Sequence, residues 1–454
     1  MSDVTSAPLP GGLGGDLSAT EVEERADVRS AFGRQQVIAL AFATLGIVLL
    51  AGLAPNLDSS PRTFGFEPPP DPVEWTFNPV KLVLAVGSLW LAVAAATLLL
   101  PFVRSKVFAM VVGVLQLVAA AAAIPLVLAI GLALSSASGT NVTNLFDESL
   151  LLSTPLALGA MTGLWCERSG IVNIGIEGQM LGSAGVGYMA YAIIGNAAGG
   201  TWLWVSAGIA VLTGATLATL HAVLSIRFRI NQIIAGVVIN LLALGVTGFL
   251  RSQVIVPSGF STGTSLENYG LPQLSHIPIV GPTFFTGGLI HFAMFGIVFL
   301  SWLIMFRTPW GLRVRACGEY PHAAETVGVD VIAMRYKAVI GGGAIAGLAG
   351  AWFSLESQAG FEDNMTNSAG FIALAALIVG KWTPWGAFGG ALLFGFARAL
   401  GSRLQFLQVE IGEFGIPSEF FQALPFVVTI VVVAGALGRA VAPAAEGQPY
   451  TPSK

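Results

Sequence analysis

The segment Glu167-Arg-Ser-Gly-Ile-Val-Asn-Ile-Gly-Ile-Glu-Gly-Gln-Met-Leu-Gly182 places charges, an amide and four glycines between apolar segments long enough to cross a bilayer. Backbone that leaves the helix within a bilayer is tolerated only where protein or a water-filled cavity surrounds it. Polar residues in such places mark solute pathways more often than they mark architecture. The segment therefore indicates an interrupted membrane fold and a candidate path for a solute.

The composition identifies an integral membrane protein. The chain has 454 residues, of which 54% are hydrophobic and 10% are charged, and its mean hydropathy is +0.77. A soluble domain carries roughly 25% charged residues. The 56 glycines agree with this class, because glycine lets membrane helices approach closely. We expect an all-α, polytopic protein.

Hydrophobic runs along the chain predict about ten to twelve transmembrane helices, since one span needs roughly 20 residues. The run at 371–400 is broken by Lys381-Trp-Thr-Pro-Trp-Gly386, which predicts two short crossings or a re-entrant pair. The apolar runs lie near 36–55, 80–101, 107–134, 150–165, 178–196, 201–225, 231–250, 288–306, 338–355, 371–400 and 418–438.

The positions of Lys and Arg predict the orientation, because cytosolic loops are enriched in these residues. The loops at 56–79 and 252–287 are long and poor in basic residues, so we place them outside. The N-terminus and the C-terminal tail then lie in the cytosol, and the protein is a multi-pass protein of the cell (plasma or inner) membrane. The basic groups that fix this orientation are Arg25, Arg29 and Arg34, Arg104 and Lys106, Arg227 and Arg229, and the loop from Arg307 to Lys337.

Several motifs of enzymes are absent from the sequence. No Gly-x-x-x-x-Gly-Lys-[Ser/Thr] segment occurs, so we expect no ATP-binding loop in this chain. The four histidines are scattered and form no metal-binding pattern. We therefore expect that the chain is not an enzyme, and that it has no cofactor or metal of its own.

Asn173 and Glu177 are the first candidates for lining a path. They lie four residues apart, so a helix places both on one face. Gly178 and Gly182 form a Gly-x-x-x-Gly pattern typical of helix contacts. The alternative is that the pair Glu167–Arg168 caps a helix in a short cytosolic turn, while Asn173 and Glu177 bond to backbone. Both interpretations stay open, because the sequence does not give the depth in the membrane.

The loop from Arg307 to Lys337 predicts a docking site for a cytosolic partner. Pro321 followed by His-Ala-Ala-Glu-Thr-Val indicates a short helix that Gly328 ends, and Val329-Asp-Val-Ile332 opens the next span. A plain turn needs only a few residues. The alternative is a charged topology anchor, which accounts for the arginines but not for the order of the other residues.

Three further residues are path candidates. Asn240 lies about two turns deeper than Asn231 and Gln232, although a single amide within a span more often bonds another helix. Phe371 and Trp382, in the broken run, could also line a path. Aromatic residues this close to Lys381 are more often interface anchors.

Three segments resemble the permease subunits of ATP-binding-cassette (ABC) importers for branched-chain amino acids, simple sugars and nucleosides, with the nucleoside type most similar. They are Glu167–Met180, Gly318-Glu-Tyr-Pro-His-Ala-Ala-Glu-Thr-Val-Gly328 and Gly370-Phe-Ile-Ala-Leu-Ala-Ala-Leu-Ile-Val-Gly-Lys-Trp-Thr-Pro-Trp-Gly386. The resemblance covers roughly residues 107–438. Two extra runs, near 36–55 and 80–101, precede the part that resembles the family.

The resemblance implies a paired permease of about ten spans that works by alternating access. Its partners would be two cytosolic ATPase subunits that use ATP, a second permease subunit (the same or a different chain), an extracytoplasmic binding lipoprotein and a small polar solute, with no nucleic acid. The ATPase-coupling residues would be Gly318, Glu319, Pro321, Ala323, Ala324 and Gly328.

These arguments predict four parts of the chain. Residues 1–35 form a disordered cytosolic tail, 36–106 an extension with two extra spans, 107–438 the permease domain and 439–454 the C-terminal tail. The predicted function is import of nucleosides or similar polar solutes. A simple-sugar permease and an ion-coupled secondary transporter are the alternatives, and the second is weakened because most acidic residues lie in loops.

Overall fold

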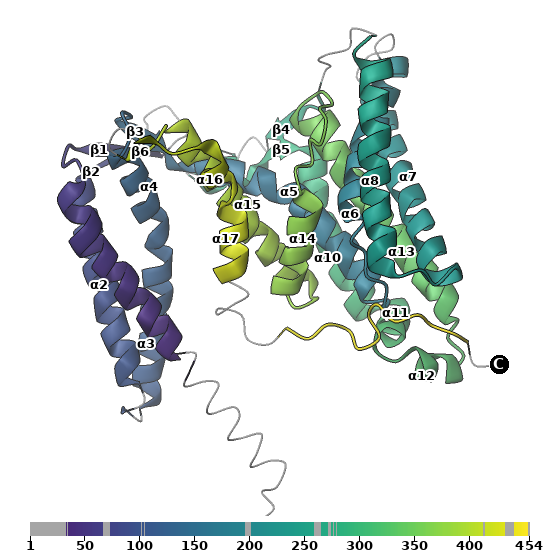
Figure 1. Cartoon of the computed structure of the whole chain (residues 1–454), viewed down its shortest axis with the longest axis horizontal. Coiled ribbons are helices and arrows are strands. Elements are labelled where there is room, and N and C mark those ends of the chain that lie inside the picture. Colours follow the sequence, from purple (N-terminus) through teal and green to yellow (C-terminus); the bar gives the residue numbers. More distant parts are fainter. Residues whose placement is uncertain are drawn as a thin grey trace, which may run out of the picture. The chain divides into compact units, whose positions relative to one another are not determined.

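The computed structural model describes residues 33, 35–66, 73–100, 102–103, 105–195, 201–257, 265–270, 274–275, 277, 279–411, 414–431 and 440–452 (Figure 1). These residues belong to two compact units, and each is described by itself. The first comprises Met1–Ser60 and Asn78–Ala133, and the second comprises Pro61–Phe77 and Leu134–Lys454. Apart from Gly33 and Gln35, the predicted tail 1–35 lies outside the described residues, as does the predicted boundary at 438/439.

The first unit is made of long apolar helices. They are the span Gln35–Asn56, α2 (Pro79–Leu99), α3 (Lys106–Ala121) and α4 (Ala123–Ala133). Asn78 caps α2 by accepting a hydrogen bond from the Lys81 amide, and Pro79 suits the first helical position. The indole of Trp90 donates to the Ala119 carbonyl at 2.9 Å and joins α2 to α3. This unit extends to residue 133, whereas the predicted N-terminal extension ended at 106.

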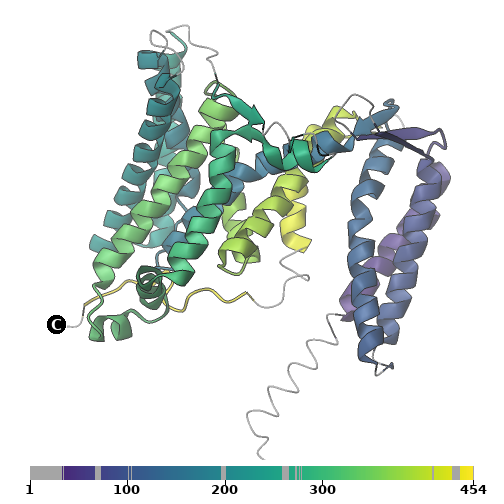
Figure 2. The same cartoon turned by 180° about the vertical axis from the view of Figure 1, so that it is seen from behind.

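The second unit holds most of the helices (Figure 2). Three helices, α6, α7 and α8, continue as π-helical turns η3 (Tyr191–Gly195), η4 (Val223–Arg227) and η5 (Arg251–Ile255), and α13 continues as η6 (Trp352–Ser357). The helices are α5 (Val142–Glu167), α6 (Ile176–Ala190), α7 (Thr201–Ala222), α8 (Gln232–Leu250), α9 (Val280–Phe285), α10 (Leu289–Arg307), α11 (Pro309–Glu319), α12 (Pro321–Thr326), α13 (Val331–Ala351), α14 (Ala369–Val379), α15 (Pro384–Phe406), α16 (Ser418–Gln422) and α17 (Leu424–Val431). The end of this unit at which α11 and α12 lie is called the α12 end below.

Eight helices among the described residues are long and apolar enough to cross a membrane. Besides these eight, α14 is a shorter apolar helix, and α6 with η3 and α15 are further helices of the bundle. The all-α, polytopic class with interrupted spans is therefore confirmed. The break predicted in the run at 371–400 is also present, because α14 ends at Val379 and α15 begins at Pro384.

Short strands at the end opposite α12 were not predicted. The strands β1 (Arg62–Phe66) and β2 (Val73–Phe77) pair antiparallel, with Phe64 opposite Trp75. The strand β3 (Gly139–Asn141), just before α5, pairs parallel with β1. Two further antiparallel pairs join β4 (Asn268–Gly270) to β5 (Thr286–Gly288) and β6 (Glu410–Ile411) to β7 (Phe414–Gly415). These strands satisfy loop backbone and leave the helical class unchanged.

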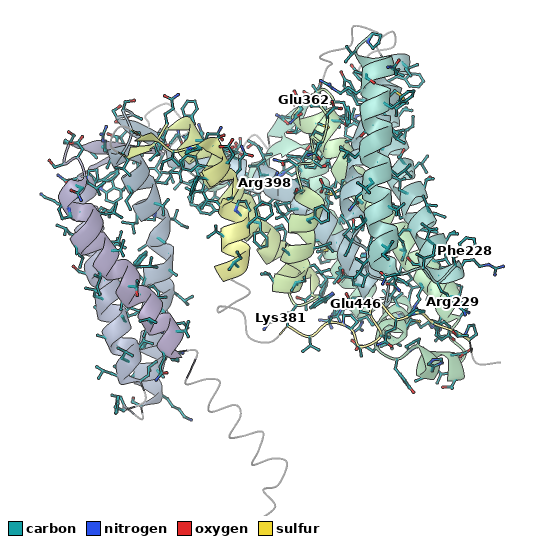
Figure 3. All side chains as sticks on the ribbon, in the orientation of Figure 1. Phe228, Arg229, Glu362, Lys381, Arg398 and Glu446 are labelled. Atoms are coloured by element: carbon teal, nitrogen blue, oxygen red, sulfur yellow. The ribbon has the colours of Figure 1, made fainter. Side chains whose placement is uncertain are left out.

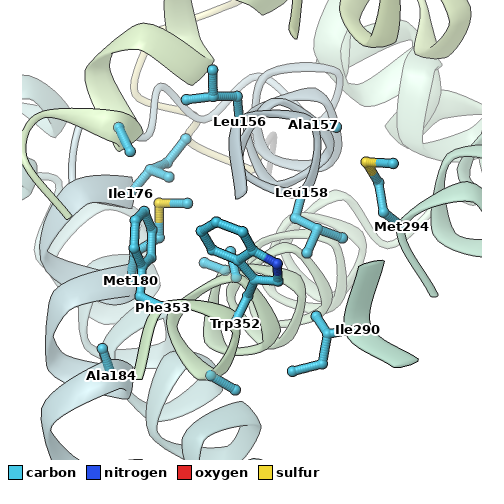
Figure 4. Packing of buried hydrophobic residues seen from close by; sticks show 14 of the residues in the cluster. Leu156, Ala157, Leu158, Ile176, Met180, Ala184, Ile290, Met294, Trp352 and Phe353 are labelled. Carbon is cyan, nitrogen blue, oxygen red and sulfur yellow. The ribbon is translucent and has the colours of Figure 1, made fainter. Parts of the chain in front are cut away.

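The core of the second unit surrounds α5, which packs against α10, α13, α14 and α15. Trp352 and Phe353, the first two residues of η6, are buried with Leu156 of α5 and Met180 of α6 (Figure 4). Helix α13 lies against α7 at glycine contacts. A Cβ on Gly347 would lie 2.6 Å from both the Ala210 carbonyl oxygen and the Val211 Cα, so only glycine permits this spacing.

We predict that Gly347→Val destabilises the protein by about 1–3 kcal/mol, because the added atoms meet backbone that has no room to shift. Thermal unfolding of the purified protein in detergent measures the effect. The control is Gly245→Val on α8, where a Cβ meets no atom within 4 Å. Equal melting temperatures for the two variants would contradict the close packing of α7 on α13.

Candidate functional site

The turn between α5 and α6 binds the turn between α14 and α15. Glu167 is buried, and its carboxylate accepts a hydrogen bond from the Trp382 indole. The guanidinium of Arg168 donates two hydrogen bonds, of 2.9 and 2.7 Å, to the Trp382 carbonyl. Lys381 and Trp382 both have positive φ angles, 53° and 51°, which mark a tight turn held by its surroundings. Two adjacent residues, Glu167 and Arg168, thus fix one turn.

The same segment also contacts α11 and α13. Arg168 forms an ion pair of 3.6 Å with Glu319 at the end of α11. A Cβ on Gly318 would lie 2.3 Å from the Arg168 carbonyl oxygen, so the two backbones touch. From α13, the buried Arg335 donates to the Ser169 carbonyl at 3.1 Å. We call Glu167–Gly170, with Glu319, Arg335 and Trp382, the polar joint.

The polar joint contains residues from all three segments that carry the family resemblance. Glu167–Gly170 belongs to the first, Glu319 belongs to the second, and Trp382 belongs to the third. The three are far apart in sequence, yet the hydrogen bonds and ion pair above join them directly. The resemblance therefore corresponds to one physical structure at the α12 end.

Asn173 is completely buried and bonded within the protein. Its side-chain amide exchanges two hydrogen bonds with that of Gln179, of 3.2 and 3.3 Å, and it also donates to the Cys166 sulfur. These partners are side chains, whereas the structural alternative raised from the sequence expected bonds to backbone. The role of Asn173 in a solute path stays a prediction.

Glu177 supports the start of α14. Its carboxylate accepts hydrogen bonds from the amides of Ser368 and Gly370, at 3.0 and 2.6 Å, and from the Thr366 hydroxyl at 2.6 Å. A carboxylate at a helix N-terminus satisfies free amides and complements the helix dipole. Gly370 has no space for a Cβ, which would lie 2.5 Å from the Glu177 amide nitrogen. In this conformation, Glu177 bonds loop backbone, and its role in a path also stays a prediction.

Asn240 joins α8 to the start of α6. Its oxygen accepts from the Gly178 amide at 2.7 Å, and its nitrogen donates to the Ile174 carbonyl at 3.0 Å. A Cβ on Gly178 would lie 2.7 Å from the Asn240 Cα, so the glycine pattern marks a helix contact as expected. Phe371 lies on α14 with 42% of its surface exposed. Phe371 follows Gly370, whose amide binds Glu177, but its phenyl side chain forms no hydrogen bond with any of the three polar candidates.

A cavity of about 380 Å³ lies among η6, the segment before α14, α15 and the helices α16 and α17. Its lining combines aromatic and polar side chains; those used below are Trp352, Phe353, Asn367, Arg398, Gln405 and Phe426. Asn173, Glu177, Asn240 and Phe371 are not among the lining residues. The sequence did hold one signal for this site, because Arg398 is a charge inside the apolar segment 384–406.

Arg398 is the cation of this cavity (Figure 3). Its guanidinium donates a hydrogen bond to the Asn367 carbonyl at 3.3 Å. A guanidinium carries five N–H groups, so one such bond leaves donor capacity for a ligand. The described residues include no group of three or more His, Cys, Asp and Glu side chains that could hold a metal.

The expected short helix in the loop 307–337 is present. Helix α12 begins at Pro321 and ends at Thr326, and Gly328 follows with φ 84°. Ala324 is buried with Cys317 and Val331, whereas Ala323 is exposed. Tyr320 and Val327, at the two ends of the helix, expose 64% and 79% of their surfaces. One face of α12 is therefore anchored, and the other is open.

An interrupted polytopic bundle with an external helix tied to its core is the architecture of a membrane permease component. The family model described as "branched-chain amino acid transport system / permease component" matches residues 145–433. The chain belongs to this family, which confirms the resemblance seen in the three sequence segments. No solved structure matches the chain.

The alignments with similar proteins cover most of the length of those proteins. The guanosine ABC transporter permease protein NupQ of Bacillus subtilis is 37% identical over 319 residues, which are 67% of this chain and 96% of that protein. The nucleoside ABC transporter permease protein NupC of Lactococcus lactis is 36% identical, with the same coverage. The putative glucose ABC transporter permease protein TsgC13 of Haloferax volcanii is 35% identical over 59% of this chain and 79% of its own.

We predict that Arg168→Gln lowers the free energy of unfolding by about 1–3 kcal/mol, because the Trp382 carbonyl and Glu319 lose a charged donor. Thermal unfolding in detergent is the measurement. The matched control is Arg313→Gln, an exposed arginine on α11. If both variants melt at the same temperature, Arg168 does not stabilise the polar joint.

Proposed function

We propose that this chain is the permease subunit of an ATP-driven importer for nucleosides and works by alternating access. Support comes from its family and from relatives named as guanosine and nucleoside permeases. The sequence has no phosphate-binding loop, so partner subunits bind and hydrolyse ATP. The permease itself carries out no chemical reaction and needs no cofactor.

The observation that carries this proposal is the connection of α12 to the polar joint. The end of α11 contacts Arg168, and Arg168 holds the turn that separates α14 from α15. A force on α12 can therefore reach the broken pair of helices through direct contacts. In this proposal two ATPase subunits dock on the open face of α12, and Gly318, Glu319, Pro321, Ala323, Ala324 and Gly328 form the coupling loop.

Charge supports placing the α12 end in the cytosol. Arg227 and Arg229 follow α7, and Arg307, Arg313 and Arg315 lie at or near α11. Positive residues concentrate on the cytosolic side of membrane proteins. In this proposal the N-terminus lies in the cytosol, and the protein spans the plasma or inner membrane. A second permease subunit, of the same or a different chain, and an extracytoplasmic binding lipoprotein complete the importer.

We predict that Ala323→Arg reduces ATP-dependent nucleoside uptake at least tenfold without changing the amount of protein in the membrane. Ala323 is exposed on α12, so the bulky charge disturbs the docking surface and leaves the core intact. Uptake of labelled guanosine by cells that carry the complete transporter measures this effect. The matched variant Ala323→Ser keeps a small side chain and retains uptake. Normal uptake with Ala323→Arg would contradict docking on this face.

The cavity near Arg398 is the proposed place of the solute. Ligand pockets measure about 300–1,000 Å³ and combine apolar walls with a few polar groups, and this cavity of about 380 Å³ has both. Trp352, Phe353 and Phe426 offer aromatic surface for a base, and Asn367 and Gln405 offer hydrogen bonds for a ribose. Arginine pairs with O6 and N7 of guanine through two parallel hydrogen bonds, so Arg398 favours 6-oxopurines.

We predict that Arg398→Gln lowers guanosine uptake about tenfold or more and changes uridine uptake much less, because uridine has no O6/N7 edge. Arg398→Lys keeps the charge but not the paired donors, and it loses most of the preference for guanosine. Competition between the two labelled nucleosides is the measurement, with detergent melting as a check on folding. An unchanged preference in both variants would remove Arg398 from substrate recognition.

Import of a simple sugar is the second candidate function. The likeness to the glucose permease protein TsgC13 favours it, and the polar groups of the cavity suit several hydroxyl groups. The same uptake assay separates the two functions. A nucleoside importer is inhibited by unlabelled guanosine and not by glucose.

A further inference from the structure

The segment Ala442–Tyr450, which we call the C-terminal strap, lies along the α12 end. Figures 1 and 2 both show it as a yellow, irregular segment that passes beside α11. It has no regular helix or strand. Even so, Ala445 and Tyr450 are buried, with 5% and 9% of their surfaces exposed. An irregular segment that buries such residues is held by specific contacts.

The first contacts join the strap to α11. The Ala445 amide donates to the Gly318 carbonyl at 2.9 Å, and the Ala444 amide donates to the Glu319 carboxylate at 3.2 Å. Gly318 lies in the last turn of α11, where carbonyl groups have no partner within the helix. The strap therefore completes the hydrogen bonding of the helix end that precedes α12.

The second contacts join the strap to the polar joint. The Gly447 amide donates to the Gly170 carbonyl at 3.2 Å, and Arg335 donates to the Gln448 carbonyl at 3.3 Å. Glu446 interacts with Glu167 and with the charge of Arg168. Burial raises the pKa of the Glu446 carboxyl to about 7, while its hydrogen bond with Glu167 and the charge of Arg168 act in the opposite direction.

The third contacts join the strap to α12. The ring of Tyr450 lies 5.3 Å from that of His322 on α12, and the Arg335 guanidinium lies 5.7 Å from the Tyr450 ring centre. Tyr450 is buried with Ala324 of α12 and with Val331 at the start of α13. One aromatic side chain therefore touches the docking helix and the arginine that holds the polar joint.

We propose that the C-terminal strap transmits movement of α12 to the membrane-spanning core, an inference that rests on the proposed ATP-driven function. Helix α12 has only six residues. The segment that connects it to α13 contains Gly328, which has a left-handed backbone conformation. The strap adds a connection from α12, through Tyr450, Gln448 and Gly447, to Arg335 and Gly170. Tyr450 is a positioning residue in this connection and does not contact the solute.

The test compares four variants of the complete transporter in proteoliposomes with its ATPase, partner permease and binding protein. Two disrupt the strap: a chain ending at Val441 and Tyr450→Ala. Two are matched controls: a chain ending at Pro452, and Tyr450→Phe, which keeps the ring. Labelled guanosine uptake and ATP hydrolysis are measured together, and their ratio gives the coupling.

For the chain ending at Val441, the ratio of guanosine uptake to ATP hydrolysis is expected to fall at least tenfold. The rate of ATP hydrolysis is expected to stay within about twofold of that of the unaltered chain. Tyr450→Ala shows a smaller loss in the same direction, and both controls match the unaltered chain. Equal falls in hydrolysis and uptake would overturn the proposal and make the strap part of the ATPase-binding surface. Unchanged coupling would overturn it as well.

Hydrogen exchange on the purified permease separates this proposal from the proposed function. Loss of the strap, or Tyr450→Ala, is expected to speed amide exchange in both α12 and the turn 167–170 by at least tenfold, whereas Tyr450→Phe does not. If exchange rises only in α12, the strap does not link the two regions, and the proposal fails. If the intact chain shows no ATP-dependent uptake of any nucleoside, the proposed function fails, and the exchange result still decides whether the strap forms the link.

Discussion

The interactions of Glu167 and Arg168 with Trp382 are the constraint on which the α12 end depends. Charged groups within or beside a bilayer are costly unless they find partners. Here the carboxyl group of Glu167 and the guanidinium of Arg168 bind the indole and the carbonyl of a single residue, and Arg168 also pairs with Glu319. The turn at Lys381–Trp382 is strained, so it needs such partners to persist. Removing either side of this arrangement leaves the other with unpaired polar groups.

The same principle accounts for the rest of the interrupted segment. Side chains from other elements satisfy several backbone groups where the chain leaves a helix. Glu177 binds the amides at the start of α14, and Asn240 binds the amide of Gly178 and the carbonyl of Ile174. Polar groups that looked like a solute path in the sequence act in this structure as connections between helices.

Two regions remain for the proposed transport function, and they lie on different elements. The open face of α12 belongs to the end that carries the polar joint, and the cavity with Arg398 lies among η6, α15 and the helices that follow. Helices α14 and α15 connect them, because their shared turn is held by Arg168 while Arg398 and Asn367 lie near their other ends. A rotation of this pair would change the cavity when α12 moves, as alternating access requires.

The sequence by itself determined the class, most of the helices and the family. Hydrophobic runs of sufficient length predict spans, and Pro321 and Gly328 act locally, so the short helix α12 was predicted from the sequence. The break between α14 and α15 was also predicted. The three family segments were also visible without coordinates.

Only the tertiary structure decided what the polar residues bind. Trp382 lies more than 200 positions from Arg168 in sequence, and Tyr450 lies more than 100 positions from His322. No local rule of spacing predicts such pairs, because they depend on how helices pack through glycine contacts such as Gly178 with Asn240. The sequence therefore predicted an interruption of the helices at Glu167–Gly182. The tertiary structure showed that this segment binds the other two segments of the family resemblance, through Glu319 and Trp382.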